Sequence, residues 1–436
     1  MGKSKDRFRL QSDEICTKVL SGIRFSPVDP QSDLRTDGIH PIGIGGLGYG
    51  YWRSPKVMGL QKTIRAFRDI SKKDISYVEV QELVSEFLKI HINPLVAGRF
   101  DLQSGDGSLI EHLNTDSIEI LQEKFFEHIS RYVADAWFWV PLNSISVDRF
   151  HGSNFVILPK PEDPRVDDNQ LENFLSKPIL SNANSYLGIR ARNLTRASEK
   201  SSVVLGAIML CMYSGTHFRH TMGKPVSGFL NFDDGLTYTS SPQHVPYLST
   251  PISLEAADRD WLTTIDNVLR NEQDNKKVIR SLQWIRSSWF SKGAERFSSI
   301  CQAIDSVTPS RFNSMQAKCG WIDEHISFDI DANAIQLLFK KLRSDVAHGD
   351  APSLVESNSY LVFLEKYGAD PQEAAFEITR QVILENFLPK IIVRPHPLQE
   401  HPEALDKMNK MLSRYGMEFT IPSGYNFSML RPQPET

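Results

Sequence analysis

The chain has 436 residues, of which 40% are hydrophobic and 23% charged. The length favours two or three domains, and the composition is that of an ordinary globular protein. The formal net charge of -4, from 49 Lys and Arg against 53 Asp and Glu, argues against a protein that coats nucleic acid along its whole surface, although it is compatible with a small basic groove.

The cysteines and the N-terminus indicate a cytoplasmic protein. Cys16, Cys211, Cys301 and Cys319 are far apart and form no C-x-x-C pair, which is typical of a reduced chain. The N-terminus, MGKSKDRFRL, lacks the apolar core of a signal peptide. The longest apolar run, Val203–Tyr213, is too short to span a bilayer. We therefore expect no membrane partner.

Residues 1–250 form a predicted mixed α/β region with a sensor or regulatory role, made of one or two subdomains. About the first fifty residues are rich in Gly, Pro and Asp and show no helical period. Apolar steps of three and four residues then predict helices through GLQKTIRAFRDISKK, YVEVQELVSEFLKIHI and Ile118–Phe138. Short β-branched or aromatic runs predict the strands that follow: WVPLNSISV, SNFVILPK, YLGIRAR, VVLGAIMLCMY and GLTYTSS.

The rest of the chain is predicted to be helical. Ser241–Asp260 holds three prolines and several turn formers, so we place a linker there and a boundary near residue 250. Helices are predicted at 258–271, 275–291, 293–306, 331–348, 355–367 and 371–388. The expected fold class is therefore α+β, with a helical bundle over 251–395 and a C-terminal extension over 396–436 that holds a short helix.

The predicted helix at 331–348 has clear ends and one apolar face. That face is about 100° wide and consists of Ile335, Leu338, Phe339, Leu342 and Val346. Asp331 is the expected N-cap, and Gly349 occupies the position where a C-terminal glycine is favoured. The helix is therefore expected to end at His348.

Arg343 and His348 stand in the last turns of this helix. The partial negative charge of a helix C-terminus favours a protonated imidazole, which suits acid–base chemistry. A five-residue step turns by about 140°, so the two side chains splay apart. A second helix or the partner copy in a two-fold dimer would have to complete the pair. The alternative is that both residues only cap the helix.

The segment LLFKKLRSDVAHG resembles the signature helix of the HEPN superfamily, in particular its Apea-like branch. In that family an Arg-x(4–6)-His motif ends a long helix, and the matching positions here are Arg343, Ser344, His348 and Gly349. The resemblance extends over roughly Ala256 to Leu388, about a third of the chain. It implies a metal-independent endoribonuclease that acts as a homodimer through the C-terminal bundle, uses no cofactor, and serves in antiviral defence or as a toxin.

The residue types fit that chemistry. Attack by the 2′-hydroxyl of RNA needs a base, an acid and a cation beside the phosphorane. His348 would serve as base or acid, Arg343 would bind the scissile phosphate, and Ser344 would donate a hydrogen bond. Residues with supporting roles are Lys340 and Lys341 for flanking phosphates, Asp345 for orienting an imidazole, and Glu295 from across the bundle.

Two alternatives compete with this interpretation, in which a phage-derived or small-molecule trigger would bind at the N-terminal region. In the first, the bundle is a non-catalytic dimerisation or ligand-binding module. In the second, the bundle only oligomerises the chain, and the N-terminal region carries the function by binding a small ligand or a foreign protein.

Two further motifs suggest other sites. GIGGLG at Gly43–Gly48 matches G-x-G-x-x-G but lacks the flanking strand and helix, which favours a surface loop. Cys211, His217 and His220 are interpreted as structural, so no metal is predicted.

Overall fold

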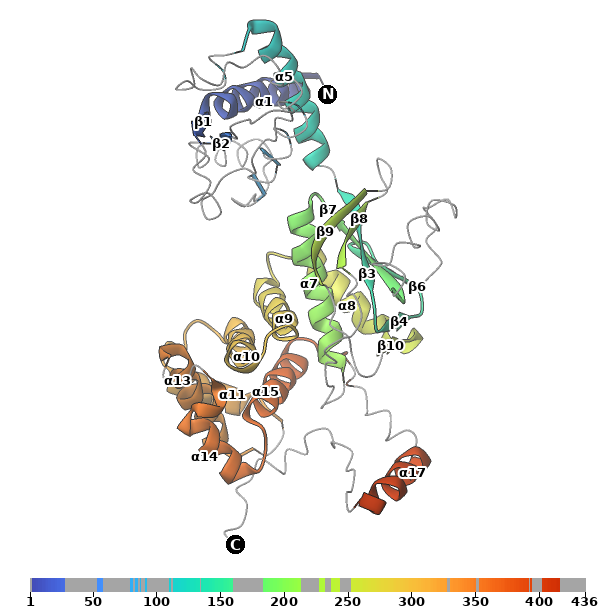
Figure 1. Ribbon diagram of the computed structural model, residues 1–436, viewed down its shortest axis with the longest axis vertical. Helices are drawn as coiled ribbons and strands as arrows, with labels where there is room; N and C mark the ends of the chain where they lie inside the picture. The colour runs from blue at the N-terminus through green and yellow to red at the C-terminus, as the bar shows by residue number, and fades with distance from the viewer. Residues whose placement is uncertain are drawn as a thin grey trace. The chain divides into compact units, whose positions relative to one another are not determined.

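The computed structural model describes residues 2–27, 53–57, 113–133, 135–159, 183–212, 227–231, 237–243, 252–327, 330–349, 353–391 and 402–415, with positions 79, 80, 83, 84, 87, 91, 110 and 393. The chain divides into two compact units, Met1–Ala136 and Trp137–Thr436, whose elements are labelled in Figure 1. No helix among these residues is long and apolar enough to cross a membrane.

The first unit pairs two helices with a hairpin. Helix α1 (Gly2–Gly22) leads into β1 (Ile23–Pro27), which pairs antiparallel with β2 (Arg53–Val57). Helix α5 (Thr115–Val133) packs on α1, and the Gln122 side-chain amide donates to the Thr17 hydroxyl at 3.0 Å. The predicted helix at Ile118–Phe138 is thus confirmed as far as Val133, after which the chain turns into a strand.

Helix α1 corrects the prediction that the first residues have no helical period. Its buried residues recur at helical steps of three and four, at Ser12, Ile15, Cys16, Val19 and Leu20. The period was missed because it starts only after a charged first half, GKSKDRFR. The predicted helix at GLQKTIRAFRDISKK lies outside the described residues. Within the next predicted helix the described Val80, Leu83, Val84 and Phe87 are helical.

The second unit holds a six-stranded sheet in the order β5-β6-β7-β3-β8-β9. Its strands are β3 (Ala136–Leu142), β5 (Phe150–His151), β6 (Phe155–Pro159), β7 (Ser185–Ala191), β8 (Ser227–Asn231) and β9 (Thr237–Gln243). A separate parallel pair joins β4 (Ile145–Val147) to β10 (Ile252–Leu254). The strands predicted at WVPLNSISV, SNFVILPK, YLGIRAR and GLTYTSS are therefore confirmed.

The fifth predicted strand, VVLGAIMLCMY, is wrong, because Val203–Cys211 of this run lie within helix α7 (Leu194–Cys211). Nearly every side chain from Val203 to Cys211 is buried, and a run that is apolar on all sides has no period to distinguish helix from strand. The helix starts nine residues before the run, where the Asn193 side chain accepts a hydrogen bond from the Arg196 backbone at 2.8 Å.

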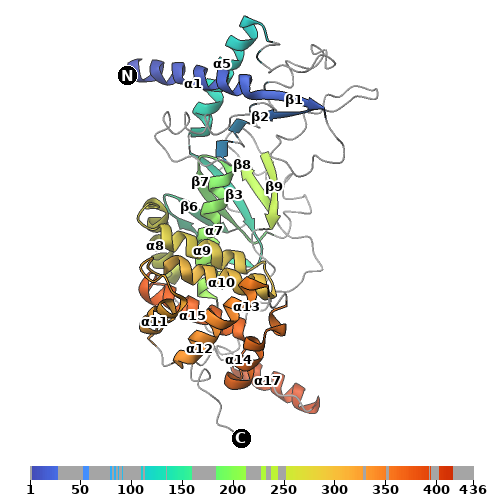
Figure 2. The same ribbon diagram turned by 90° about the vertical axis from the view of Figure 1, so that its left-hand side faces the viewer.

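Helices follow the sheet almost to the end of the second unit (Figure 2). They are α8 (Arg259–Arg270), α9 (Lys276–Ser288), α10 (Gly293–Val307), α11 (Met315–Glu324), α12 (Ala332–Gln336), α13 (Arg343–His348), α14 (Asn358–Tyr367), α15 (Pro371–Asn386) and α17 (Pro402–Leu412). Short turns are η3 (Ala256–Asp258), η4 (Leu337–Leu342), η5 (Leu354–Glu356) and η6 (Ser413–Tyr415). The six predicted helices and the terminal one are thereby confirmed.

The sheet and the helices share one apolar core. The sheet face that carries Phe155, Ile157 and Leu187 joins a single cluster with α7 and the helices up to Ile391. Helices α7 and α9 approach so closely at Gly206 that a Cβ there would lie 2.1 Å from the Leu282 carbonyl oxygen. A continuous core of this kind makes the sheet and the helices one folding unit.

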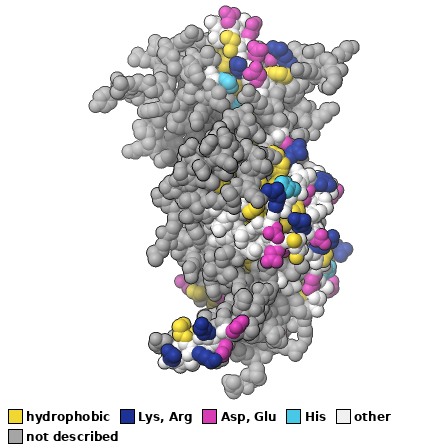
Figure 3. Space-filling model, turned by 90° about the vertical axis from the view of Figure 1, so that its right-hand side faces the viewer, with side chains coloured by type: hydrophobic (Ala, Val, Ile, Leu, Met, Phe, Trp, Pro, Cys, Tyr) yellow, Lys and Arg dark blue, Asp and Glu magenta, His cyan; other side chains and the backbone are white. Residues whose placement is uncertain are grey.

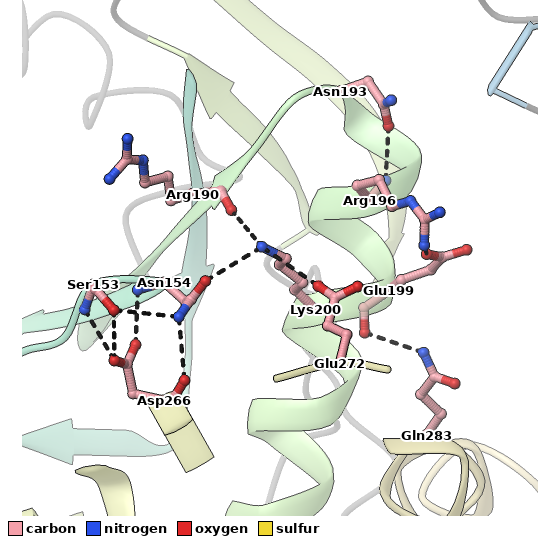
Figure 4. Close-up of polar contacts among 10 residues, drawn as sticks. All are labelled: Ser153, Asn154, Arg190, Asn193, Arg196, Glu199, Lys200, Asp266, Glu272 and Gln283. Carbon is pink, nitrogen blue, oxygen red and sulfur yellow. Dashed lines mark hydrogen bonds and ion pairs between the residues drawn. The ribbon is translucent and has the colours of Figure 1, made fainter. Parts of the chain in front are cut away.

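A buried carboxylate joins α8 to the turn between β5 and β6 (Figure 4). Asp266 accepts from the Ser153 backbone at 3.1 Å, from the Ser153 hydroxyl at 2.8 Å and from the Asn154 backbone at 2.7 Å. Burial raises the pKa of Asp266, but these hydrogen bonds outweigh it and leave the pKa below its usual value. The stability that Asp266 contributes is thus present above the unfolded-state pKa and is lost as the pH falls through the folded-state pKa.

The chain divides into compact units at Ala136. The domain boundary near residue 250 stays a prediction. Strands β9 and β10, which lie before and after residue 250 in the sequence, both belong to the second unit, and β10 pairs with β4. The described chain is thus mixed α and β, with a sheet in its middle and helices in its C-terminal part.

Candidate functional site

The helix that carries the Arg-x-x-x-x-His motif starts and ends as predicted. The Asp331 side chain accepts from the Asn333 backbone at 2.9 Å and from the Tyr367 hydroxyl at 2.7 Å. Gly349 ends the helix with φ of 78°, a left-handed conformation that glycine adopts at little cost. The predicted buried face is present, since Ile335, Leu338, Phe339 and Leu342 are in the core and Val346 packs against it.

The middle of this helix departs from regular geometry. Between α12 and α13, η4 (Leu337–Leu342) is a π-helical turn, in which hydrogen bonds reach one residue further than in an α-helix. Such turns widen the helix and rotate the residues that follow them. Helix α13 itself is regular, so the splay expected between Arg343 and His348 is retained.

Arg343 is held by an aspartate on another helix. Its Nη2 lies 2.6 Å from the Asp305 Oδ2 in the last turn of α10, and the other carboxylate oxygen lies 2.9 Å from the Lys318 ammonium of α11. Burial would lower the pKa of the guanidinium, but the hydrogen bond and charge of Asp305 raise it. Arg343 is therefore a permanent cation, positioned through one of its nitrogens.

His348 is exposed at the end of α13, next to a glycine whose Cα faces open space. Ser344 and Lys341 are exposed on the same helical segment. Within the described part of the chain, no hydrogen bond or ion pair joins Arg343 to His348. One copy of the chain thus presents an anchored cation and a solvent-accessible imidazole that point apart.

The residues with predicted supporting roles lie in different places. The Lys340 ammonium donates to the Gln316 side chain at 3.0 Å. The Asp345 carboxylate accepts from the Ser357 hydroxyl at 2.6 Å and so ties α13 to the start of α14. Glu295 is exposed in the first turn of α10. It lies roughly 15 Å along the helix axis from Asp305, because each residue advances the helix by about 1.5 Å.

Asp305 is the site residue that the sequence analysis missed. Its carboxylate stands in the last turn of α10, where the helix dipole disfavours a negative charge. An aspartate in such a place needs a cationic partner, and this signal was available in the sequence. The partner's identity was not available, because Arg343 and Lys318 come from helices that only the tertiary fold brings to α10.

The other motifs contribute nothing to this site. Cys211 is buried at the end of α7, and its thiol donates to the Ile208 carbonyl at 2.9 Å. His217, His220 and the Gly43–Gly48 segment lie outside the described residues. The described ranges contain no group of three or more His, Cys, Asp or Glu residues that could hold a metal ion.

Surface charge on one face of the molecule is mixed. Figure 3 shows Lys and Arg side chains interspersed with Asp and Glu side chains over the described residues of that face. Charge of one sign does not dominate there, which agrees with the nearly balanced composition. A surface for a polyanion has to be sought locally, helix by helix.

Comparison with protein-family models, with curated proteins and with solved structures finds no match for this chain.

Proposed function

We propose that this chain is an endoribonuclease that cuts RNA at a site built on α13 in a homodimer. The observation that carries the proposal is the state of the two motif residues: Arg343 is a positioned cation on Asp305, and His348 is exposed at the end of the same helix. The resemblance of this helix and its neighbours to the HEPN superfamily supports the same function.

The reaction uses the nucleophile that RNA carries itself. His348 as base accepts the 2′-hydroxyl proton while the 2′-oxygen bonds to phosphorus, and Arg343 stabilises the charge on the phosphorane oxygens. The bond from phosphorus to the 5′-oxygen breaks, and an acid returns a proton to that oxygen. The products are a 2′,3′-cyclic phosphate and a 5′-hydroxyl end. Lys340 and Lys341 would contact flanking phosphates, and Ser344 would donate a hydrogen bond.

A homodimer would supply the acid and base together, because each copy contributes one His348: one imidazole would accept the 2′-hydroxyl proton, and the other, protonated, would return a proton to the 5′-oxygen. It would also bring an Arg343 of one copy to a His348 of the other, since the two side chains of one copy point apart. Helix α14 offers an apolar surface beside the site, with Leu361 45% and Leu364 41% exposed. Its N-cap, Ser357, is hydrogen-bonded to Asp345 on α13. Burying this surface against a second copy would bring two α13 helices together.

Control by the N-terminal region belongs to the proposal. Residues 1–250 would sense a phage-derived or small-molecule trigger. The protein would act in the cytoplasm, in antiviral defence or as a toxin. The HEPN resemblance supports the defence role. The division at Ala136 makes the first compact unit the part of the chain best suited to a separate sensing function.

One observation favours a second candidate function. Asp305 links Arg343 to Lys318, so Arg343 also joins α13 to α10 and α11. An arginine with only this structural role fits a non-catalytic dimerisation or ligand-binding bundle, with the function in the N-terminal region. Such a chain would need Arg343 for stability and would not need His348 at all.

The test is incubation of total RNA with the purified full-length chain in excess chelator. Wild type, Arg343→Ala and His348→Ala are compared, with the exposed residues Arg259 and His151 changed to alanine as matched controls. We expect cleavage to 2′,3′-cyclic phosphate ends by wild type and both controls, with losses on the order of a hundredfold or more in the two site variants. Cleavage by His348→Ala at the wild-type rate would refute the proposal.

A further inference from the structure

Helix α9 carries a concentration of positive charge that is unusual for this chain. Its sequence, KKVIRSLQWIRSS, contains Lys276, Lys277, Arg280 and Arg286 and no acidic residue, whereas the whole chain has a net charge of -4. The two lysines stand in the first turn, where the helix dipole disfavours cations. The local fold therefore does not explain why these charges are here.

Three of the α9 side chains form one row on its exposed side. Lys277, Arg280 and Trp284 follow each other at steps of three and four residues and so lie on the same helical face. The opposite face is buried through Val278, Leu282 and Ile285. Trp284 is 38% exposed, a large fraction for an indole.

The cations of this row are available. Among the described residues no carboxylate forms an ion pair with Lys276, Lys277 or Arg280. Glu272, in the loop before α9, pairs with a lysine of α7 instead: its carboxylate lies 3.7 Å from the Lys200 ammonium (Figure 4). Asp274 is the other acidic residue of that loop. The four cations of α9 exceed the charge of this one carboxylate, so the local net charge is positive.

A second exposed aromatic side chain lies just past the end of α9, on a different edge from Trp284. Phe290 is 38% exposed, and the Arg286 guanidinium lies 4.6 Å from the centre of its ring. Stacked guanidinium and aromatic groups alternate in this way on surfaces that bind unpaired bases. Figure 2 shows α9 at the front of the bundle, beside α10.

We propose that this stripe, made of Lys277, Arg280 and Trp284, binds single-stranded RNA. Lysine and arginine attract backbone phosphates, and exposed rings stack on bases that a duplex would hide. Anionic lipid is the less fitting partner, because one tryptophan and one phenylalanine on different edges do not form a continuous apolar face. Helix α10 packs on α9 and positions Arg343 through Asp305, so the stripe lies on the helix next to the proposed active site.

The inference rests on the proposed function in one respect: the bound RNA is a substrate only if the chain is an endoribonuclease. Its test measures binding and needs no cleavage. The probe is a fluorescein-labelled 2′-O-methyl oligouridine, which has no 2′-hydroxyl to attack, and binding to the full-length chain is measured by fluorescence anisotropy. We expect Trp284→Ala to weaken binding about tenfold. The double variant K277E/R280E should weaken it by at least about tenfold and reduce the salt slope by roughly 0.7 per cation removed.

Controls and contrary outcomes are defined on the same chain. Arg259→Glu and Met411→Ala change an exposed cation and an exposed apolar side chain elsewhere and should bind as wild type. No binding by wild type, equal binding by the stripe variants, or stripe-dependent binding only to phosphatidylserine vesicles would each overturn the inference. Stripe-dependent binding without any RNA cleavage would support the inference and refute the proposed endoribonuclease. RNA cleavage by wild type, with oligouridine binding unaffected in the stripe variants, would support the endoribonuclease and refute the inference.

Discussion

At the scale of single residues, the candidate site depends on one carboxylate. Asp305 holds Arg343 through one nitrogen and Lys318 through its other oxygen, and all three side chains are partly buried. Charge-assisted hydrogen bonds in such surroundings are stronger than neutral ones. Asp305 thus has two separable effects. It joins α10, α11 and α13, and it fixes the orientation of the Arg343 guanidinium, including the N–H groups that do not contact Asp305.

Asp305→Asn should separate these effects, because it preserves shape and removes charge. We expect the free energy of unfolding to fall by about 1–2 kcal/mol, measured by denaturant titration. We also expect kcat for RNA cleavage to fall about tenfold, with a smaller change in KM, since a misplaced cation stabilises the phosphorane less well. Lys318→Met removes only the other partner and should retain kcat. Equal kcat in wild type and Asp305→Asn would show that Arg343 needs no orienting carboxylate.

At the scale of elements, the contact between α7 and α9 decides how the sheet joins the bundle. Gly206 lets the two backbones meet, and no larger residue fits, because the obstructing atom is a backbone carbonyl oxygen. The same contact supports the stripe on α9, since it fixes the buried face of α9 and therefore its exposed face. A shift of α9 would affect the core and the proposed RNA surface together.

Gly206→Ala should therefore be strongly destabilising, although alanine is the better helix former. We expect a loss of about 3 kcal/mol or more of unfolding free energy from overpacking. Gly320→Ala on α11 is the matched control, because nothing lies within 4 Å of its added Cβ. That change should stabilise the chain by about 0.5–1 kcal/mol through helix propensity. Thermal unfolding of both variants checks this, and an unchanged melting temperature for Gly206→Ala would contradict the close approach.

At the scale of the whole molecule, the proposed function requires two copies. The double variant L361D/L364D should convert the dimer to a monomer, because two carboxylates cannot be buried in an apolar interface without partners. Sedimentation equilibrium measures the mass, and RNA cleavage should be lost in parallel. Met411→Asp, on an exposed apolar residue of α17, is the control and should remain dimeric. A monomeric variant that still cleaves RNA would show that one copy suffices.

Much of the second unit was predictable because its signals are local. Caps, glycines and apolar steps of three and four residues located the helices from Arg259 to Asn386 except α11, and short β-branched or aromatic runs located four stretches of strand. The motif helix ended where its glycine predicted. Among the elements that were not predicted, α1 and α7 were missed for local reasons: α1 hides its period behind a charged half, and the apolar run of α7 is buried on all sides.

The sequence by itself thus determined most helices of the second unit, the capped ends of the motif helix and the positions of Arg343 and His348 on it. Only the tertiary structure decided that the sheet and the bundle share a core, that Asp305 is the partner of Arg343, and that Trp284 is on the surface. The physical reason is the range of the interactions. Propensity, capping and periodicity act within a few residues, whereas burial and ion pairing depend on segments that meet only after the chain has folded.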